Sequence, residues 1–198
     1  MYFCDIPKLT SFGEYEVQVP LRSVPRTLAE YIQDYGLQMD PKFQRAHVWG
    51  PLQRSRYVEY LLRDGHSSRT IYFNCYNWRG RACSPGPMLL VDGKQRLSAV
   101  LGFLDNRVTA FGKLFREFQG PLPSINGLQF HVNYLETYSE VLRWYLDLNE
   151  GGVAHTEKEL NKVRAELAKG STAWPARQEE DYPDILLDAL GKLRRRPE

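Results

Sequence analysis

The stretch from residue 88 to residue 104 constrains the fold more than any other part of the chain. Four apolar residues in a row, 88–91, predict a short buried strand. Asp92 and Gly93 then predict a tight turn, after which apolar residues recur at helical spacing as far as Leu104. The local order is therefore strand, turn and helix.

The start of this predicted helix carries an unusual charge pattern. Asp92 is expected to cap the first free backbone N–H groups, and Gly93 lets the backbone turn or approach a ligand closely. Lys94 and Arg96 lie in the first turn, where the helix dipole already favours an anion and added positive charge is unfavourable. The two cations therefore indicate a bound anion, most naturally phosphate. The alternative is that Asp92 is only a cap and that both cations are solvated or paired with carboxylates.

Composition limits the classes of function. The chain has 198 residues, and 42% of them are apolar, which suffices for a folded core. Its net charge of only +2 does not indicate a nucleic-acid-binding protein by overall charge. Neither a membrane span nor a signal peptide is recognisable, so we expect a cytoplasmic protein without a membrane partner. Three cysteines without paired spacing and four scattered histidines indicate no disulfide frame and no metal site built from protein ligands alone. A magnesium ion that arrives with a nucleotide would need only one or two carboxylates.

The remaining segments complete a mixed pattern of helices and strands. The predicted strands are 14–19, 70–76, a short one around Val108, and 128–135, with a hairpin connection at 77–87; the predicted helices are 26–35, one that begins at Pro51, 137–148, 156–167 and a short one at 183–193. Thr137 with Glu140 and Thr156 with Glu159 have the spacing of a capping box. We therefore expect the α+β class, with a small mixed sheet and packed helices. One domain would span 1–168, and a tail with one short helix would follow at 169–198.

Three separated motifs occur in a characteristic order. They are Gln44-Arg45 followed by Trp49, then Asp92-Gly93-Lys94-Gln95-Arg96, then Leu148-Asn149-Glu150-Gly151-Gly152. Over residues 20–165 this arrangement resembles the DGQQR-motif family of the ParB/sulfiredoxin-like superfamily. That family supplies the N-terminal domain of GmrSD-like modification-dependent restriction enzymes and of the SspE phage-defence protein. This chain has Lys94 where the family usually has glutamine.

The resemblance implies a ParB/sulfiredoxin-like fold whose central motif binds a nucleoside triphosphate (ATP, GTP or CTP) with magnesium, with weak hydrolysis as an expected activity. Carried over by position, the residues of the nucleotide site are Gln44, Arg45, Asp92, Gly93, Lys94, Gln95 and Arg96. Arg96 would bind phosphate through its bidentate fork, and Asp92 would hold magnesium or position a water, which makes both candidate catalytic residues. Gln44 and Arg45 would close the pocket. Lys94 keeps phosphate chemistry but weakens the case for hydrolysis.

A second hypothesis is a non-enzymatic module that binds DNA or a protein of a bacterial defence system, as a regulator or decoy of a related complex. Larger relatives carry an HNH-type nuclease, but this sequence shows no His-Asn-His arrangement, so we expect a stand-alone domain without nuclease activity. Basic residues interleaved with aromatic ones could form a face for DNA or an ordinary solvated surface. They are Lys42, Arg45, Arg54, Arg56, Arg79 and Arg81 with Trp49, Tyr57 and Trp78.

Several residues near the motifs also have a purely structural interpretation. Trp49 would be a core aromatic, and Arg45 and Arg96 could both belong to structural ion pairs. Asn149 would be a helix-ending cap rather than a ligand. His47 could act as a base, or could be an ordinary exposed loop histidine.

Overall fold

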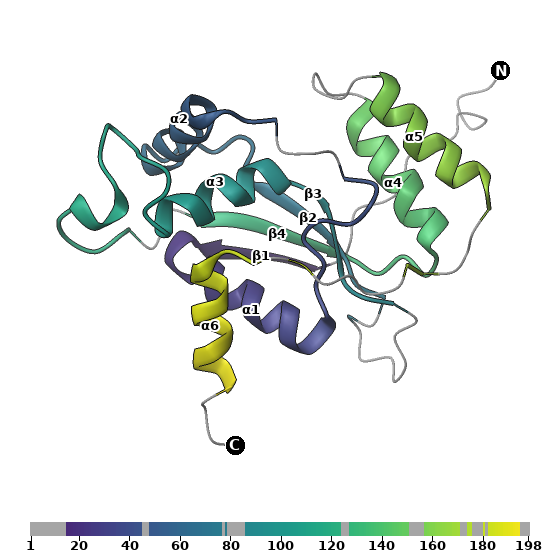
Figure 1. The fold of residues 1–198 in the computed structure, drawn as a ribbon, viewed down its shortest axis with the longest axis horizontal. Helices are drawn as coiled ribbons and strands as arrows, with labels where there is room; N and C mark the ends of the chain where they lie inside the picture. Colours follow the sequence, from purple (N-terminus) through teal and green to yellow (C-terminus); the bar gives the residue numbers. More distant parts are fainter. Residues whose placement is uncertain are drawn as a thin grey trace.

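The computed structural model describes residues 15–44, 48–76, 78, 86–123, 127–150, 157–170, 174–175, 180 and 182–194. Its strands are β1 (Tyr15–Pro20), β2 (Thr70–Asn74), β3 (Leu89–Asp92) and β4 (Gly127–Asn133). Its α-helices are α1 (Val24–Tyr35), α2 (Pro51–Leu62), α3 (Lys94–Leu104), α4 (Tyr138–Glu150), α5 (Glu157–Ala168) and α6 (Asp184–Arg194), with short 3-10 helices at Leu21–Ser23 and Phe115–Glu117. The expected α+β class, a small mixed sheet with packed helices, is confirmed (Figure 1).

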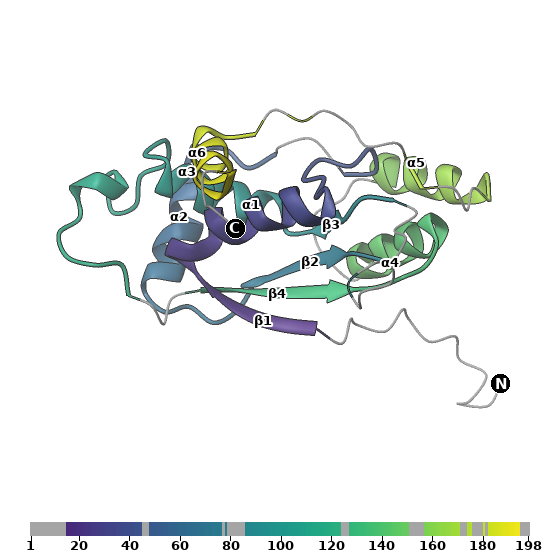
Figure 2. The ribbon, with the colours of Figure 1, turned by 90° about the horizontal axis from the view of Figure 1, so that it is seen from below.

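The strands form one sheet in the order β1-β4-β2-β3. β4 pairs antiparallel with β1 and parallel with β2, whereas β2 and β3 pair antiparallel. The antiparallel pair agrees with the hairpin expected from the intervening sequence, of which residues 77 and 79–85 lie outside the described part. Helices α1, α2, α3 and α6 lie together on one side of the sheet, and α4 and α5 form a separate group beside the ends of the strands (Figures 1 and 2).

Strand β3 lies between two hydrophobic clusters. Leu90 belongs to the cluster under α1, α2, α3 and α6, whereas Leu89 and Val91 belong to a second cluster with Trp144 and Tyr145 of α4. Successive side chains of a strand point to opposite faces of the sheet, so a strand covered on both faces needs apolar residues at every position. This explains the unbroken apolar run 88–91.

Two local predictions from the sequence are wrong. The N-cap of α3 is Gly93 rather than Asp92, because the backbone turns through a positive φ of 103° at that residue. No strand forms around Val108, where the backbone N–H donates to the carbonyl oxygen of Gly102 at 2.9 Å and the side chain packs into the first cluster. Val108 is thus apolar because its side chain packs into the core at the end of α3, and not because it belongs to a β-strand.

The capping box at α4 is confirmed. The Glu140 N–H donates to the Thr137 hydroxyl at 3.2 Å, and the Thr137 N–H donates to the Glu140 carboxylate at 2.9 Å. Thr156, for which the same role was predicted, lies outside the described residues.

The C-terminal segment packs onto the rest of the fold. Helix α6, predicted at 183–193, is confirmed and lies against α1, with Leu186 fully buried in the first cluster. Upstream of the helix, the Tyr182 hydroxyl donates to the Leu37 carbonyl at 3.2 Å. Both contacts tie the tail to the N-terminal half of the chain, while the expected boundary at residue 168 stays a prediction.

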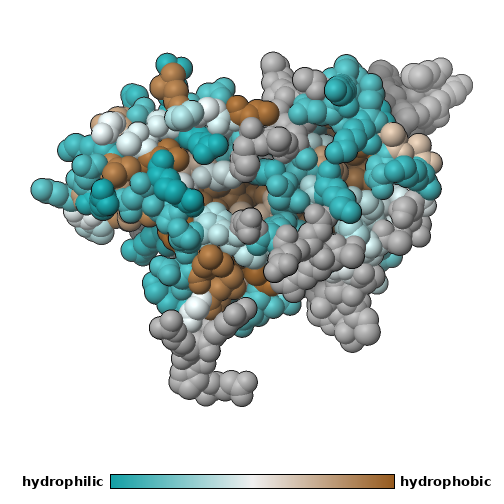
Figure 3. All heavy atoms as spheres, in the orientation of Figure 1, coloured by the Kyte–Doolittle hydropathy of each residue, from teal (hydrophilic) through white to brown (hydrophobic). Residues whose placement is uncertain are grey.

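The face of the molecule drawn in Figure 3 is mainly hydrophilic. The face seen in Figure 3 carries apolar residues only in small groups separated by polar ones. No helix in the described part of the chain is both long and apolar enough to cross a membrane.

Replacing Leu186 by alanine should lower the free energy of unfolding by about 2–5 kcal/mol, because the substitution removes buried methyl groups and leaves a cavity. Leu187 of the same helix is 50% exposed and provides the matched control. Leu187→Ala should change stability by less than about 0.5 kcal/mol. Equal effects of the two variants in urea denaturation would contradict the docking of α6.

Candidate functional site

The turn between β3 and α3 requires glycine at position 93. Its φ of 103° lies in the left-handed region that side chains disfavour, and an added Cβ would come within 2.6 Å of the Ile71 Cδ1 atom. The backbone therefore passes directly over β2 before α3 begins. Asp92 at the end of β3 and the first turn of α3 therefore flank a tight turn that lies against β2.

Arg96 forms an ion pair with Asp92 one turn earlier. The two side chains are 17% and 32% exposed, so the pair is accessible from solvent at its edge. Asp92 is the register partner of Tyr72 on β2. Burial raises the pKa of the Tyr72 phenol, and the nearby Arg96 charge partly offsets this effect, so a neutral hydroxyl lies beside the pair.

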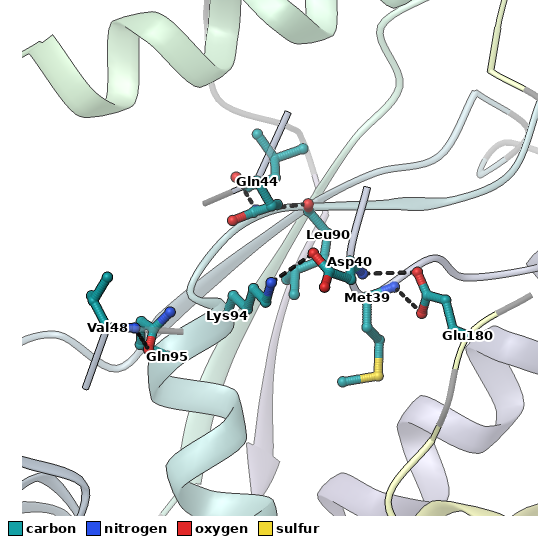
Figure 4. A network of polar contacts seen from close by, with 9 residues as sticks. Met39, Asp40, Gln44, Val48, Leu90, Lys94, Gln95 and Glu180 are labelled. Atoms are coloured by element: carbon teal, nitrogen blue, oxygen red, sulfur yellow. Dashed lines mark hydrogen bonds and ion pairs between the residues drawn. The ribbon is translucent and has the colours of Figure 1, made fainter. Parts of the chain in front are cut away.

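Lys94 is held by a different carboxylate. Its Nζ atom lies 2.6 Å from Asp40 Oδ1, and only 7% of the lysine side chain is exposed, against 59% for Asp40 (Figure 4). The backbone N–H groups of Met39 and Asp40 in turn donate to the two carboxylate oxygens of Glu180, each at 2.8 Å. Burial raises the pKa of Glu180, and these two hydrogen bonds oppose that shift.

Two glutamine side chains link the loop before α2, described at residues 36–44 and 48–50, to the central motif (Figure 4). Gln95 Oε1 accepts hydrogen bonds from the N–H groups of Val48 and Trp49, both at 3.2 Å. Gln44 Nε2 donates to the carbonyl oxygens of Leu90 at 3.0 Å and Val91 at 2.8 Å. β3 is the edge strand of the described sheet, and Gln44 supplies a side-chain donor to two of its carbonyl oxygens.

The structure thus brings six of the seven predicted site residues together: Gln44, Asp92, Gly93, Lys94, Gln95 and Arg96. Arg45, and the nearby His47, lie outside the described residues. The alternative that Lys94 and Arg96 pair with carboxylates is what the structure shows. An anionic ligand would therefore have to displace a carboxylate from Arg96.

The composition of the site suits a metal ion only if a ligand brings further oxygen atoms. Within the described ranges, no group of three or more His, Cys, Asp or Glu side chains could hold a metal ion. Magnesium bound with a nucleotide takes most of its ligands from phosphate and water and needs only one or two carboxylates. Asp92, partly exposed at the end of β3, fits that requirement.

Three polar partners of the motif, Asp40, Glu180 and Tyr72, were not predicted from the sequence. Asp40 and Glu180 lie 54 and 140 residues from the groups they bind, Lys94 and the Asp40 backbone respectively. Tyr72 comes to lie beside Asp92 only because β2 and β3 pair in this register. A lysine that becomes buried needs a carboxylate nearby, and this requirement is the one signal for such a partner. It does not indicate where in the chain the carboxylate lies.

The aromatic residues proposed for a basic-aromatic face all pack against other rings or backbone groups, and three of the proposed basic residues, Arg45, Arg79 and Arg81, lie outside the described part of the chain. Tyr57 is buried, and its hydroxyl donates to the Ser68 carbonyl at 2.8 Å. Trp49 packs against Tyr57 with ring centroids 5.3 Å apart, as expected for a core aromatic. Trp78 packs instead between Tyr31 and Tyr35. Tyr57 is therefore unavailable to a base, whereas Trp49 and Trp78 are only partly buried, and the basic-aromatic face stays a prediction.

The structural interpretation of Asn149 agrees with its contacts. The residue lies in the last turn of α4, where its Nδ2 atom donates to the Tyr145 carbonyl oxygen at 2.6 Å. The side chain is buried at the end of the helix and does not join the β3–α3 site.

Comparison with known sequences gives one match. The family model described as GmrSD restriction endonuclease, N-terminal domain, covers residues 28–169. No curated protein and no solved structure matches the chain. The matched region includes β2, β3, β4 and all three motifs, while β1 and α6 lie outside it. Because the match covers most of its length, the chain belongs to the family of N-terminal domains of GmrSD restriction endonucleases.

Proposed function

We propose that this domain binds a nucleoside triphosphate together with magnesium at the β3–α3 turn. The family belongs to restriction enzymes, so the binding would serve a restriction-related defence process that acts on DNA. The observation that carries the proposal is the partly exposed Asp92–Arg96 pair, whose two residues flank the left-handed Gly93 at the N-terminus of α3.

The chemistry of the pair suits a magnesium nucleotide better than a bare phosphate. Magnesium would take the Asp92 carboxylate, and a phosphate would take the Arg96 guanidinium, whose planar fork binds two oxygens at once. Each charge then exchanges one partner for another and none is left unpaired. The first N–H groups of α3 would add a favourable dipole for the phosphate. Without magnesium, Asp92 would repel the ligand, so binding should depend on the metal.

Hydrolysis requires a group that positions a water molecule, and Asp92 is the candidate for this role. Lys94, which replaces the usual glutamine of the family, is already paired with Asp40 and largely buried. Lys94 would therefore stabilise the charge of a γ-phosphate less than a free lysine would. For this reason we expect weak turnover. Binding without turnover would favour the non-enzymatic alternative, a nucleotide-dependent regulator that binds DNA or a protein of a defence complex.

One of the three nucleotides ATP, GTP or CTP, with magnesium, should raise the melting temperature of the wild-type protein. At a concentration 100 times its dissociation constant, a ligand stabilises the folded state by about 2.7 kcal/mol. Arg96→Ala and Arg96→Lys should both lose most of this shift, because neither retains the bidentate fork, and Arg96→Lys keeps the charge beside Asp92.

Arg26→Ala serves as the matched control, since Arg26 forms an exposed pair with Glu30 at 2.9 Å on α1, far from the motif in sequence. It should leave the shift unchanged. Titration calorimetry provides the direct measurement. A wild-type protein that binds none of the three nucleotides, or an Arg96→Lys variant that binds as well as wild type, would reject the proposal.

Variants at Gln95 separate the structural role of the motif from its proposed role in binding. Gln95→Leu should lower stability by about 1–3 kcal/mol, because the Val48 and Trp49 N–H groups lose their acceptor. Gln95→Glu keeps an acceptor at the same place but adds a negative charge beside the phosphate. It should be more stable than Gln95→Leu in urea denaturation, yet bind nucleotide more weakly than wild type. Unchanged nucleotide binding in Gln95→Glu would place the phosphate elsewhere.

A further inference from the structure

We propose that the domain has a second ligand site, distinct from the β3–α3 turn, which binds a nucleotide unit consisting of an aromatic base with a phosphate. The site is a cavity of about 560 Å³ bordered by the loop before α2, by α4 and α5, and by the segment that follows α5. Its lining residues are Lys42, Phe43, Tyr138, Lys162, Val163, Glu166, Trp174 and Pro175. The volume lies in the range of ordinary small-molecule sites.

Three aromatic rings form the apolar part of the cavity. The ring centroid of Tyr138 lies 6.3 Å from that of Phe43 and 6.5 Å from that of Trp174. Phe43 and Tyr138 are buried, and the Trp174 indole N–H donates to the Glu136 carbonyl oxygen at 3.2 Å. Trp174 is the partly exposed ring of the three, and its contacts hold it in place, so a planar base could stack on it at little cost in side-chain entropy.

Tyr138 adds a polar group to the aromatic wall. Burial raises the pKa of its hydroxyl to about 12, so the group stays protonated at physiological pH. A neutral phenol can donate a hydrogen bond to a base or phosphate oxygen.

The charges at the cavity are not balanced internally. Lys42 and Lys162 are exposed on its lining, and neither forms an ion pair within the part of the chain that the structure describes. The single lining carboxylate, Glu166, is already paired with Lys169 at 2.6 Å. Two uncompensated ammonium groups at the rim of the cavity favour an anion.

The aromatic wall and the two lysines together select one class of ligand. A simple phosphate would use the lysines but not the three rings, and a neutral aromatic compound would use the rings but not the lysines. A nucleotide uses both, since its base can stack while its phosphate lies between the ammonium groups. The unit could be a free mononucleotide or one residue of a DNA single strand, which offer the same chemistry.

The test uses titration of the full chain with dAMP, with a short oligo(dT) strand and with inorganic phosphate, followed by tryptophan fluorescence and by calorimetry. Binding of dAMP or oligo(dT) should quench Trp174, and the quenching should disappear in Trp174→Phe. The double variant Lys42→Ala/Lys162→Ala should bind about tenfold more weakly or worse, because two charge-assisted contacts are lost. Lys158→Ala, an exposed lysine of α5 outside the cavity, should bind as wild type does.

Arg96→Ala distinguishes this site from the proposed triphosphate site and should leave dAMP binding intact. Tighter binding of oligo(dT) than of dAMP assigns the site to a DNA strand, and the reverse assigns it to free nucleotides. The proposal is overturned if neither probe binds, if inorganic phosphate binds as well as dAMP, or if quenching persists in Trp174→Phe. It is also overturned if binding is lost in Arg96→Ala and kept in the double lysine variant.

Discussion

The hydrogen bonds that close the outer edge of β3 determine how the rest of the site is arranged. β3 is the edge strand of the sheet in the part of the chain that the structure describes, so its outward N–H and carbonyl groups need other partners. The Gln38 backbone bonds to Met88 and Leu90, at 2.8 and 3.0 Å, and Gln44 continues the same edge with its side-chain amide. The loop before α2 is thereby drawn along β3, and without this closure Asp40 and Gln95 would have no fixed partners.

The same closure explains how the protein tolerates a largely buried lysine. An ammonium group loses much of its hydration on burial and needs a carboxylate nearby. Asp40 supplies it, and the Glu180 carboxylate holds the backbone of Asp40 in position. The C-terminal segment thus stabilises the motif indirectly, although it lies outside the region that defines the family.

The sequence predicted the elements well where the signal was local. The strand, turn and helix at 88–104, the capping box at Thr137 and the short helix at 183–193 all depend on neighbouring residues. Predictions became wrong where tertiary packing decides the outcome. Asp92 has the ideal chemistry of a cap, but the left-handed Gly93 takes that position and Asp92 pairs with Arg96 instead. Partners such as Glu180 could not be predicted, because no local pattern specifies a contact 140 residues away.

A net charge of +2 conceals two opposite electrostatic situations in this domain. At the β3–α3 turn each cation has its own carboxylate, so a ligand must offer both a metal ion and an anion if no charge is to be left unpaired. At the cavity lined by Tyr138 and Trp174, Lys42 and Lys162 form no ion pair with any residue that the structure describes, and an anion alone would improve the balance. Because Phe43 borders the cavity and the next residue, Gln44, closes β3, one loop forms part of both regions.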